Sequence, residues 1–136
     1  MKTLPSLRCA AGALAVALFS AVPAARAVTP AEQLAGYAAQ AGALPAPARG
    51  QQLFTSTHGR EWSCSSCHGA VPTQTGKHAS TGKPIGALAP AFNAERFVDA
   101  AKAEKWFRRN CNDVIGRECS PAEKADMLAW LMTLKP

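Results

Sequence analysis

The feature that most constrains this chain is the run Cys64-Ser65-Ser66-Cys67-His68. Cys-x-x-Cys-His is the attachment signal for a c-type haem. Two thiols separated by two residues lie on one helical turn, so both can add to the two vinyl groups of one porphyrin. The histidine follows directly and binds the iron from the proximal side. The motif therefore predicts one covalent haem c held by Cys64, Cys67 and His68.

Cys64 and Cys67 also fit two other chemistries, a thioredoxin-like redox pair and half of a zinc site. The redox pair is expected after a strand in a β-α-β setting, and no such pattern precedes the motif. A zinc site needs further ligands at short spacing, whereas the later cysteines, Cys111 and Cys119, lie far along the chain. The haem interpretation is therefore favoured over both.

The first 27 residues have the pattern of a secretory signal peptide. Lys2 and Arg8 form a basic start, an apolar run follows at 10–22, and Ala25-Arg26-Ala27 is an A-x-A cleavage site. The apolar run is too short for a membrane span, and no later stretch is long enough. We expect cleavage near Ala27 and export to the periplasm, with an uncleaved anchor as the alternative. The mature chain, residues 28–136, would then have no membrane span.

Cleavage would change both the charge and the cysteine count. The 136-residue chain has a formal net charge of +6, and the leader carries three basic and no acidic residues, so +3 would remain. Two haem propionates would bring this close to neutral, so the basic composition does not indicate nucleic-acid binding. Cys9 would be lost with the leader. With two cysteines on the haem, Cys111 and Cys119 are expected to form a disulfide in an oxidising compartment.

The mature segment has the length of one small domain. It lacks alternating strand patterns, so the sequence predicts an all-α fold. Thr29-Pro30-Ala31-Glu32 and Ser120-Pro121-Ala122-Glu123 predict the starts of the first and last helices, because each combines a capping box with proline. A second helix is expected from near Pro47. Its Gly50-x-x-Leu53-Phe54 run, before Cys-x-x-Cys-His, resembles the first core helix of class I cytochromes c.

After His68 comes a loop of residues 70–93 that is rich in Gly, Pro, Thr and Lys. Loops this long in compact domains are usually functional, and this one is expected to wrap the haem edge. The next helix is expected to begin at or beside Asn93. Its apolar stripe has the spacing i, i+3, i+4 and i+7 and consists of Ala103, Trp106, Phe107 and Asn110.

Residue patterns alone leave the sixth iron ligand open. The methionines after the leader, Met127 and Met132, lie in the expected last helix, where methionine usually fills the core. His78 would give a bis-histidine haem, although most loop histidines, His58 among them, are expected to be solvated. Asn110 is a polar residue on an aromatic stripe. Either iron ligation or a place at the helix C-terminus would explain it.

Longer stretches of the chain resemble the SHP (sphaeroides haem protein) family of cytochromes c. The resemblance covers nearly the whole mature chain, and its most specific part is Arg109-Asn110-Cys111. The matching stretches are residues 81–83, Ile85, 88–90, 98–119 and 120–126. In that family an asparagine beside a disulfide cysteine is the sixth haem ligand. The resemblance therefore implies a class I-like cytochrome fold, Asn110 as the iron ligand beside His68, and a Cys111–Cys119 disulfide.

The resemblance also implies a function. The family's asparagine stays on ferric iron and leaves on reduction, after which the ferrous haem can bind oxygen or nitric oxide. For this chain it implies a periplasmic electron-transfer and gas-binding protein rather than an enzyme. The implied redox partners are a dihaem cytochrome c and a membrane b-type cytochrome. Two other functions stay open: an electron shuttle saturated by His/His or His/Met ligands, and a small enzyme that reduces oxygen, nitric oxide or peroxide.

Overall fold

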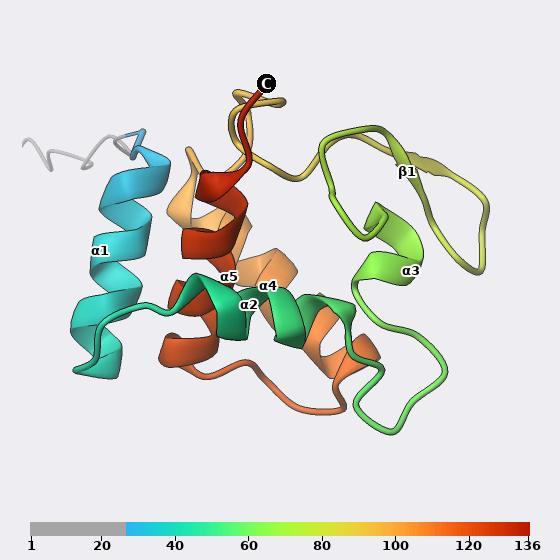
Figure 1. Cartoon of the computed structure of the whole chain (residues 1–136), viewed down its shortest axis with the longest axis horizontal. Coiled ribbons are helices and arrows are strands. Elements are labelled where there is room, and N and C mark those ends of the chain that lie inside the picture. The colour runs from blue at the N-terminus through green and yellow to red at the C-terminus, as the bar shows by residue number, and fades with distance from the viewer. Residues whose placement is uncertain (1–26) are drawn as a thin grey trace, which may run out of the picture.

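The computed structural model describes residues 27–136, so the expected leader up to residue 26 lies outside the described part. Within it the helices are α1 (Pro30–Ala41), α2 (Pro47–Thr55), α3 (Ser65–His68), α4 (Ala100–Val114) and α5 (Pro121–Thr133). Two short strands, β1 (Gly76–Lys77) and β2 (Pro84–Ile85), form an antiparallel hairpin after α3. The predicted all-α fold is confirmed apart from this hairpin (Figure 1). No helix of residues 27–136 is long and apolar enough to cross a membrane.

The capping boxes begin α1 and α5 as predicted. The Thr29 hydroxyl accepts from the Glu32 N–H at 3.1 Å, and the Glu32 carboxylate accepts from the Thr29 N–H at 2.7 Å. Ser120 and Glu123 make the same reciprocal pair at the start of α5. Each box satisfies backbone donors that the first helical turn would otherwise leave unpaired. These two helix starts therefore follow from four-residue sequence signals.

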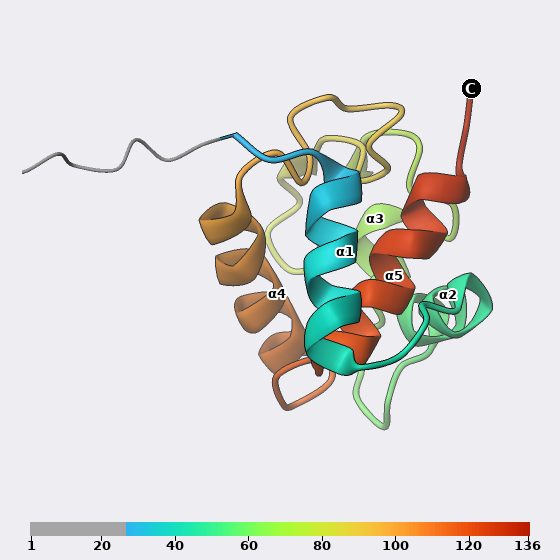
Figure 2. The ribbon, with the colours of Figure 1, turned by 90° about the vertical axis from the view of Figure 1, so that its left-hand side faces the viewer.

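α5 is the central helix and packs against both α1 and α2 (Figures 1 and 2). Leu128 and Leu131 are fully buried there, and Trp130 lies against the fully buried Phe54 of α2, with ring centroids 5.0 Å apart. Removal of these large apolar side chains from water is the main force that holds the two helices together. The α2–α5 pair also supports the motif, because Phe54 lies between α5 and His68.

α2 approaches α5 closely at Gly50. Asp126 of α5 is buried at this crossing, and its carboxylate accepts hydrogen bonds from Arg49 Nε at 2.7 Å and Arg49 Nη2 at 3.0 Å. The same carboxylate accepts from the Ala46 N–H at 2.5 Å. A buried carboxylate needs such partners, since an uncompensated one would be costly. The crossing is thus fixed by close backbone contact together with a paired charge.

α4 begins at Ala100, so the predicted start at Asn93 is wrong. Phe97 has a φ of 59°, in the left-handed region, which interrupts a right-handed helix. The Phe97 carbonyl accepts from Gln33 Nε2 of α1 at 2.9 Å, and the carbonyl of residue 98 accepts from the N–H of residue 28 at 3.1 Å. Asp99 then caps the helix by accepting from the Lys102 N–H at 2.9 Å. Tertiary contacts with the start of α1 therefore override the helical periodicity.

α4 has few buried side chains, namely Phe107 and Cys111. Phe107 meets the ring of Tyr37 in α1 edge-on at 5.7 Å. Glu104 forms an ion pair with Lys124 of α5 at 2.7 Å. α4 is thus attached to α1 and α5 along one side, and Figure 2 shows it beside α1.

Candidate haem-binding site

The attachment motif occupies one helical turn. The N–H groups of Cys67 and His68 both donate to the Cys64 carbonyl, at 3.3 and 3.2 Å, and neither motif cysteine is in a disulfide. Serine side chains support this turn: the Ser66 hydroxyl accepts from the Ser63 N–H at 3.0 Å, and the Ser63 and Ser65 hydroxyls lie 2.7 Å apart. The arrangement presents two free thiols and an imidazole from one turn, as covalent haem attachment requires.

His68 suits a metal-ligand role. Its imidazole is half-buried, with the Phe54 ring centroid 6.1 Å away. Burial, together with the nearby positive charge of Arg96, lowers the pKa of His68 to about 4. The neutral form is therefore favoured at physiological pH, and the neutral imidazole is the form that binds a metal.

The two motif thiols lack the surroundings of a zinc site. Within residues 27–136, no group of three or more His, Cys, Asp or Glu side chains is placed to hold a metal ion. Burial raises the pKa of the Cys64 thiol to about 11, which favours the thiol over the thiolate that zinc requires. A turn that presents two free thiols beside a neutral histidine, without further metal-binding side chains grouped around it in residues 27–136, fits haem c.

The hairpin 76–85 packs on the attachment turn. A Cβ at Gly76 would overlap the Cys67 carbonyl, and the Ala79 N–H donates to Cys67 Sγ at 3.2 Å. His78 belongs to the hairpin turn, where its Nδ1 accepts from the Thr81 N–H at 3.3 Å. One of its two ring nitrogens is thus engaged in holding the turn. The loop after His68 is therefore folded into a hairpin, and this hairpin covers the Cys67 side of the attachment turn.

Asn110 lies within α4, which continues to Val114, so the helix C-terminus interpretation of this residue is wrong. Its side chain is exposed. Trp106 lies one helical turn before it on the same flank and is 42% exposed. The Asn110 amide is therefore not packed in the core and is available as a ligand. By contrast, Met127 is buried in the core and Met132 packs against it, as expected.

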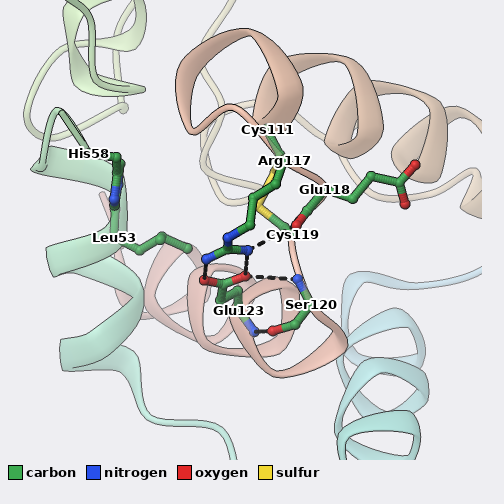
Figure 3. Close-up of polar contacts among 8 residues, drawn as sticks. All are labelled: Leu53, His58, Cys111, Arg117, Glu118, Cys119, Ser120 and Glu123. Atoms are coloured by element: carbon green, nitrogen blue, oxygen red, sulfur yellow. Dashed lines mark hydrogen bonds and ion pairs between the residues drawn. A yellow bond between two sulfur atoms is a disulfide. The ribbon is translucent and has the colours of Figure 1, made fainter. Parts of the chain in front are cut away.

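Cys111, directly after Asn110, forms a disulfide with Cys119 (Figure 3). After Cys119 the chain enters α5 at Ser120, where an ion pair and a hydrogen bond hold the start of the helix. Arg117 pairs with both oxygens of Glu123, at 2.6 and 2.8 Å, and the Ser120 N–H donates to the same carboxylate at 2.8 Å. Hydrogen bonding from Arg117 is the largest cause that lowers the pKa of Glu123, to about 2. The end of α4 that carries Asn110 is therefore fastened to the start of α5.

Known proteins match this chain over most of its length. A family described as "Domain of unknown function (DUF1924)" matches residues 40–131. The cytochrome c-type protein SHP of Cereibacter sphaeroides is 52% identical over 107 residues, which cover 76% of this chain and 82% of that protein. The chain belongs to the SHP family of cytochromes c. Cytochrome c'' of Methylophilus methylotrophus is 46% identical over 80 residues, 59% of this chain and 56% of that protein.

Solved structures agree with the membership in the SHP family. The structure of oxidised SHP matches with a TM-score of 0.75 and 50% identity, over 79% of this chain and 99% of that one. Oxidised cytochrome c'' matches with a TM-score of 0.69 and 35% identity, over 79% of this chain and 95% of that one. The predicted class I-like cytochrome fold is thereby confirmed. This SHP-family protein is a c-type cytochrome with one covalently bound haem.

Two arginines of this SHP-family cytochrome have contacts that no local sequence pattern indicates. Arg96, close enough to lower the pKa of His68, donates to the carbonyls of Gly86 and Ala87 at 2.8 and 2.9 Å. Arg60 belongs to the loop just before the motif and reaches the end of α4. It lies against Gly116 and donates to the Asp113 carbonyl at 3.5 Å. No local pattern marks either residue, because each bonds to carbonyls that another segment supplies.

His58 also differs from its expected solvated state. Its side chain is half-buried, and its Nε2 lies 2.7 Å from the Leu53 carbonyl near the end of α2 (Figure 3). The residue has a φ of 53°, which turns the chain sharply after α2. His58 therefore closes the turn that follows α2 in this family member.

Proposed function

We propose that this protein is a periplasmic electron-transfer cytochrome in which Asn110 holds the sixth iron position in the ferric state and leaves it on reduction. The reduced protein would then take a diatomic ligand such as oxygen or nitric oxide. The observation that carries the proposal is the exposed Asn110 amide, directly before disulfide-bonded Cys111, in an SHP-family chain. SHP itself is described as an oxygen-binding cytochrome c, and work on cytochrome c'' concerns haem-ligand detachment.

The chemistry of the two side chains supports a redox-linked switch. When bound, the haem supplies an iron centre that exchanges one electron and has a sixth coordination position. Neutral His68 is a strong donor anchored by the covalent motif beside it. The Asn110 amide is a weak donor, so its hold depends on the positive charge of the iron. Loss of one charge on reduction should therefore release Asn110 and leave His68 in place.

Competing side chains are engaged elsewhere. Met127 and Met132 contribute to the core, and His78 uses Nδ1 to hold the hairpin turn. These placements favour Asn110 over a His/Met or His/His shuttle. They also leave His78 less free to act as the distal acid or base that a small oxygen-, nitric oxide- or peroxide-reducing enzyme would need.

Export to the periplasm is part of the proposal. The leader pattern up to Ala27 supports it, as does the Cys111–Cys119 disulfide, because disulfides persist in oxidising compartments. The mature cytochrome domain would then be residues 28–136. N-terminal sequencing of the haem-loaded protein from a periplasmic extract tests this. A first residue other than one near Val28 would contradict the cleavage site.

The partners are proposed as a dihaem cytochrome c and a membrane b-type cytochrome. Three exposed basic residues of α4 support docking to an acidic surface: Lys102, Lys105 and Arg108. Such docking should make the rate of reduction by an isolated dihaem cytochrome c fall as ionic strength rises. A rate that does not change with salt would contradict electrostatic docking.

The deciding experiment is the visible spectrum of the protein before and after dithionite, and again after carbon monoxide. Wild type should be low-spin when ferric, high-spin when ferrous, and shifted by carbon monoxide. Asn110→Ala should be high-spin in both states, whereas Asn110→His should stay low-spin and resist carbon monoxide. Asn112→Ala, an exposed asparagine two positions further on, is the matched control and should behave as wild type. A low-spin ferrous wild type indifferent to carbon monoxide would overturn the proposal.

A further inference from the structure

Trp106 and Asn110 share a flank of α4 that is not in contact with α1 or α5. Residues four apart on a helix are neighbours on its surface. The other flank is occupied, because Glu104 pairs there with Lys124 at 2.7 Å. Phe107, between the two flanks, is buried against Tyr37. Trp106 is therefore a large side chain on the same flank of α4 as Asn110, one helical turn away.

The Trp106 indole is exposed on α4 and has a cation over one face. It is 42% exposed. The Arg109 guanidinium carbon lies 5.7 Å from the ring centroid, close enough for a cation–π contact. Arg109 in turn approaches the Asp113 carboxylate at 3.8 Å. The Arg109 guanidinium thus lies over one face of the Trp106 ring, beside Asn110 on the same helix.

We infer that Trp106 is the wall of the ligand position that Asn110 vacates, and that it limits this position to diatomic-sized ligands. The inference rests on the function proposed above. An indole one helical turn from the sixth ligand would obstruct a long ligand that projects along α4 more than it obstructs a diatomic one. Arg109 acts as a positioning residue, because it holds the indole from the outside. Steric walls of this kind discriminate between ligands that differ by a few methylene groups.

The test compares ligands of increasing length on the dithionite-reduced protein. Carbon monoxide, ethyl isocyanide and n-butyl isocyanide are titrated, and the ratio of each isocyanide affinity to that of carbon monoxide is recorded. Trp106→Ala should raise the n-butyl isocyanide ratio by roughly tenfold or more, with a smaller rise for ethyl isocyanide. Arg109→Met should raise it less. Lys105→Ala, on the exposed side of the same helix, is the control and should leave the ratio unchanged.

A second measurement applies even if Trp106→Ala fails to fold. In the diamagnetic ferrous carbon monoxide complex, the indole protons of Trp106 should be displaced upfield by the porphyrin ring current. The milder variant Trp106→Phe identifies these resonances by their loss. Indole protons at ordinary positions would overturn the inference, as would an unchanged affinity ratio in Trp106→Ala. A reduced wild type that binds no carbon monoxide would overturn the proposed function as well, so the two failures are distinguishable.

Discussion

A Cβ atom on Gly50 of α2 would overlap the backbone carbonyl of Asp126 in α5. The two backbones therefore meet without any side chain between them, one helical turn before Phe54. Because Phe54 lies against both Trp130 and His68, the distance between α2 and α5 determines where the attachment motif sits. The crossing of these two helices thus links the stability of the fold to the position of His68.

Substitution of Gly50 should therefore be destructive. Gly50→Ala should lower the free energy of unfolding by about 2–3 kcal/mol, because the added methyl group forces two backbones apart. Gly36→Ala in α1 is the matched control, since nothing lies within 4 Å of a Cβ there. It should raise stability by up to about 1 kcal/mol, the difference in helix propensity. Urea unfolding followed by circular dichroism measures both, and equal effects of the two substitutions would contradict the close crossing.

Covalent attachment should depend on both thiols of the motif. Cys64→Ser/Cys67→Ser should lose all haem that survives denaturing gel electrophoresis, because no sulfur remains to form a thioether. Either single variant should keep a haem bound through one thioether. Haem staining of denaturing gels and the intact mass check this. The disulfide variant Cys111→Ala/Cys119→Ala should still bear covalent haem, and its loss there would show that attachment needs more than the motif.

The Arg117–Glu123 pair should make stability sensitive to acid. The pKa of Glu123 is lowered to about 2 in the fold, below its value of about 4.3 in an unfolded chain. The pair therefore stabilises the protein fully above about pH 4.3, and this contribution is lost as the pH falls towards 2. The difference in unfolding free energy between wild type and Glu123→Gln should shrink across this interval. Glu118→Gln, an exposed neighbour whose carboxylate lies outside the pair, is the control variant. A constant difference for Glu123→Gln would contradict the prediction.

Loss of the Cys111–Cys119 disulfide should affect stability and ligation together. Cys111→Ala/Cys119→Ala should lower the free energy of unfolding by about 2–3 kcal/mol, by the entropy of the closed loop. Either single variant should lose nearly as much, because the bond is lost with the first substitution. The ferric low-spin fraction should also fall, since Asn110 adjoins Cys111. A double variant with wild-type stability and an unchanged ferric spectrum would show that the bond positions nothing.

Much of the site could be predicted because its signals are local. The spacing of Cys64, Cys67 and His68 is set within one helical turn, and the serines beside them complete that turn. The capping boxes of Thr29 and Ser120 likewise act over four residues. A short stretch of sequence contains all the atoms that these features need, so the pattern and the structure agree.

The start of α4 could not be predicted for the opposite reason. The helical spacing of apolar residues extends back beyond Ala100, but the chain is drawn to α1 by the bond from Gln33 to the Phe97 carbonyl. The hairpin of residues 76–85 could not be predicted either, because its two-residue strands are too short to produce an alternating pattern of apolar and polar residues. In both places a partner distant in sequence provides the hydrogen bond, and local periodicity carries no information about it.

Local sequence is enough to identify the Cys64-x-x-Cys67-His68 motif, the caps that begin α1 and α5, and the two further cysteines, Cys111 and Cys119. Tertiary structure alone decided that Gly50 meets Asp126, that Arg96 lies near His68, and that Asn110 is exposed within α4. The physical reason is the separation along the chain between the residues that interact. Caps and attachment turns form between residues a few positions apart, whereas helix crossings and the charge of Arg96 near His68 arise only when distant segments pack together.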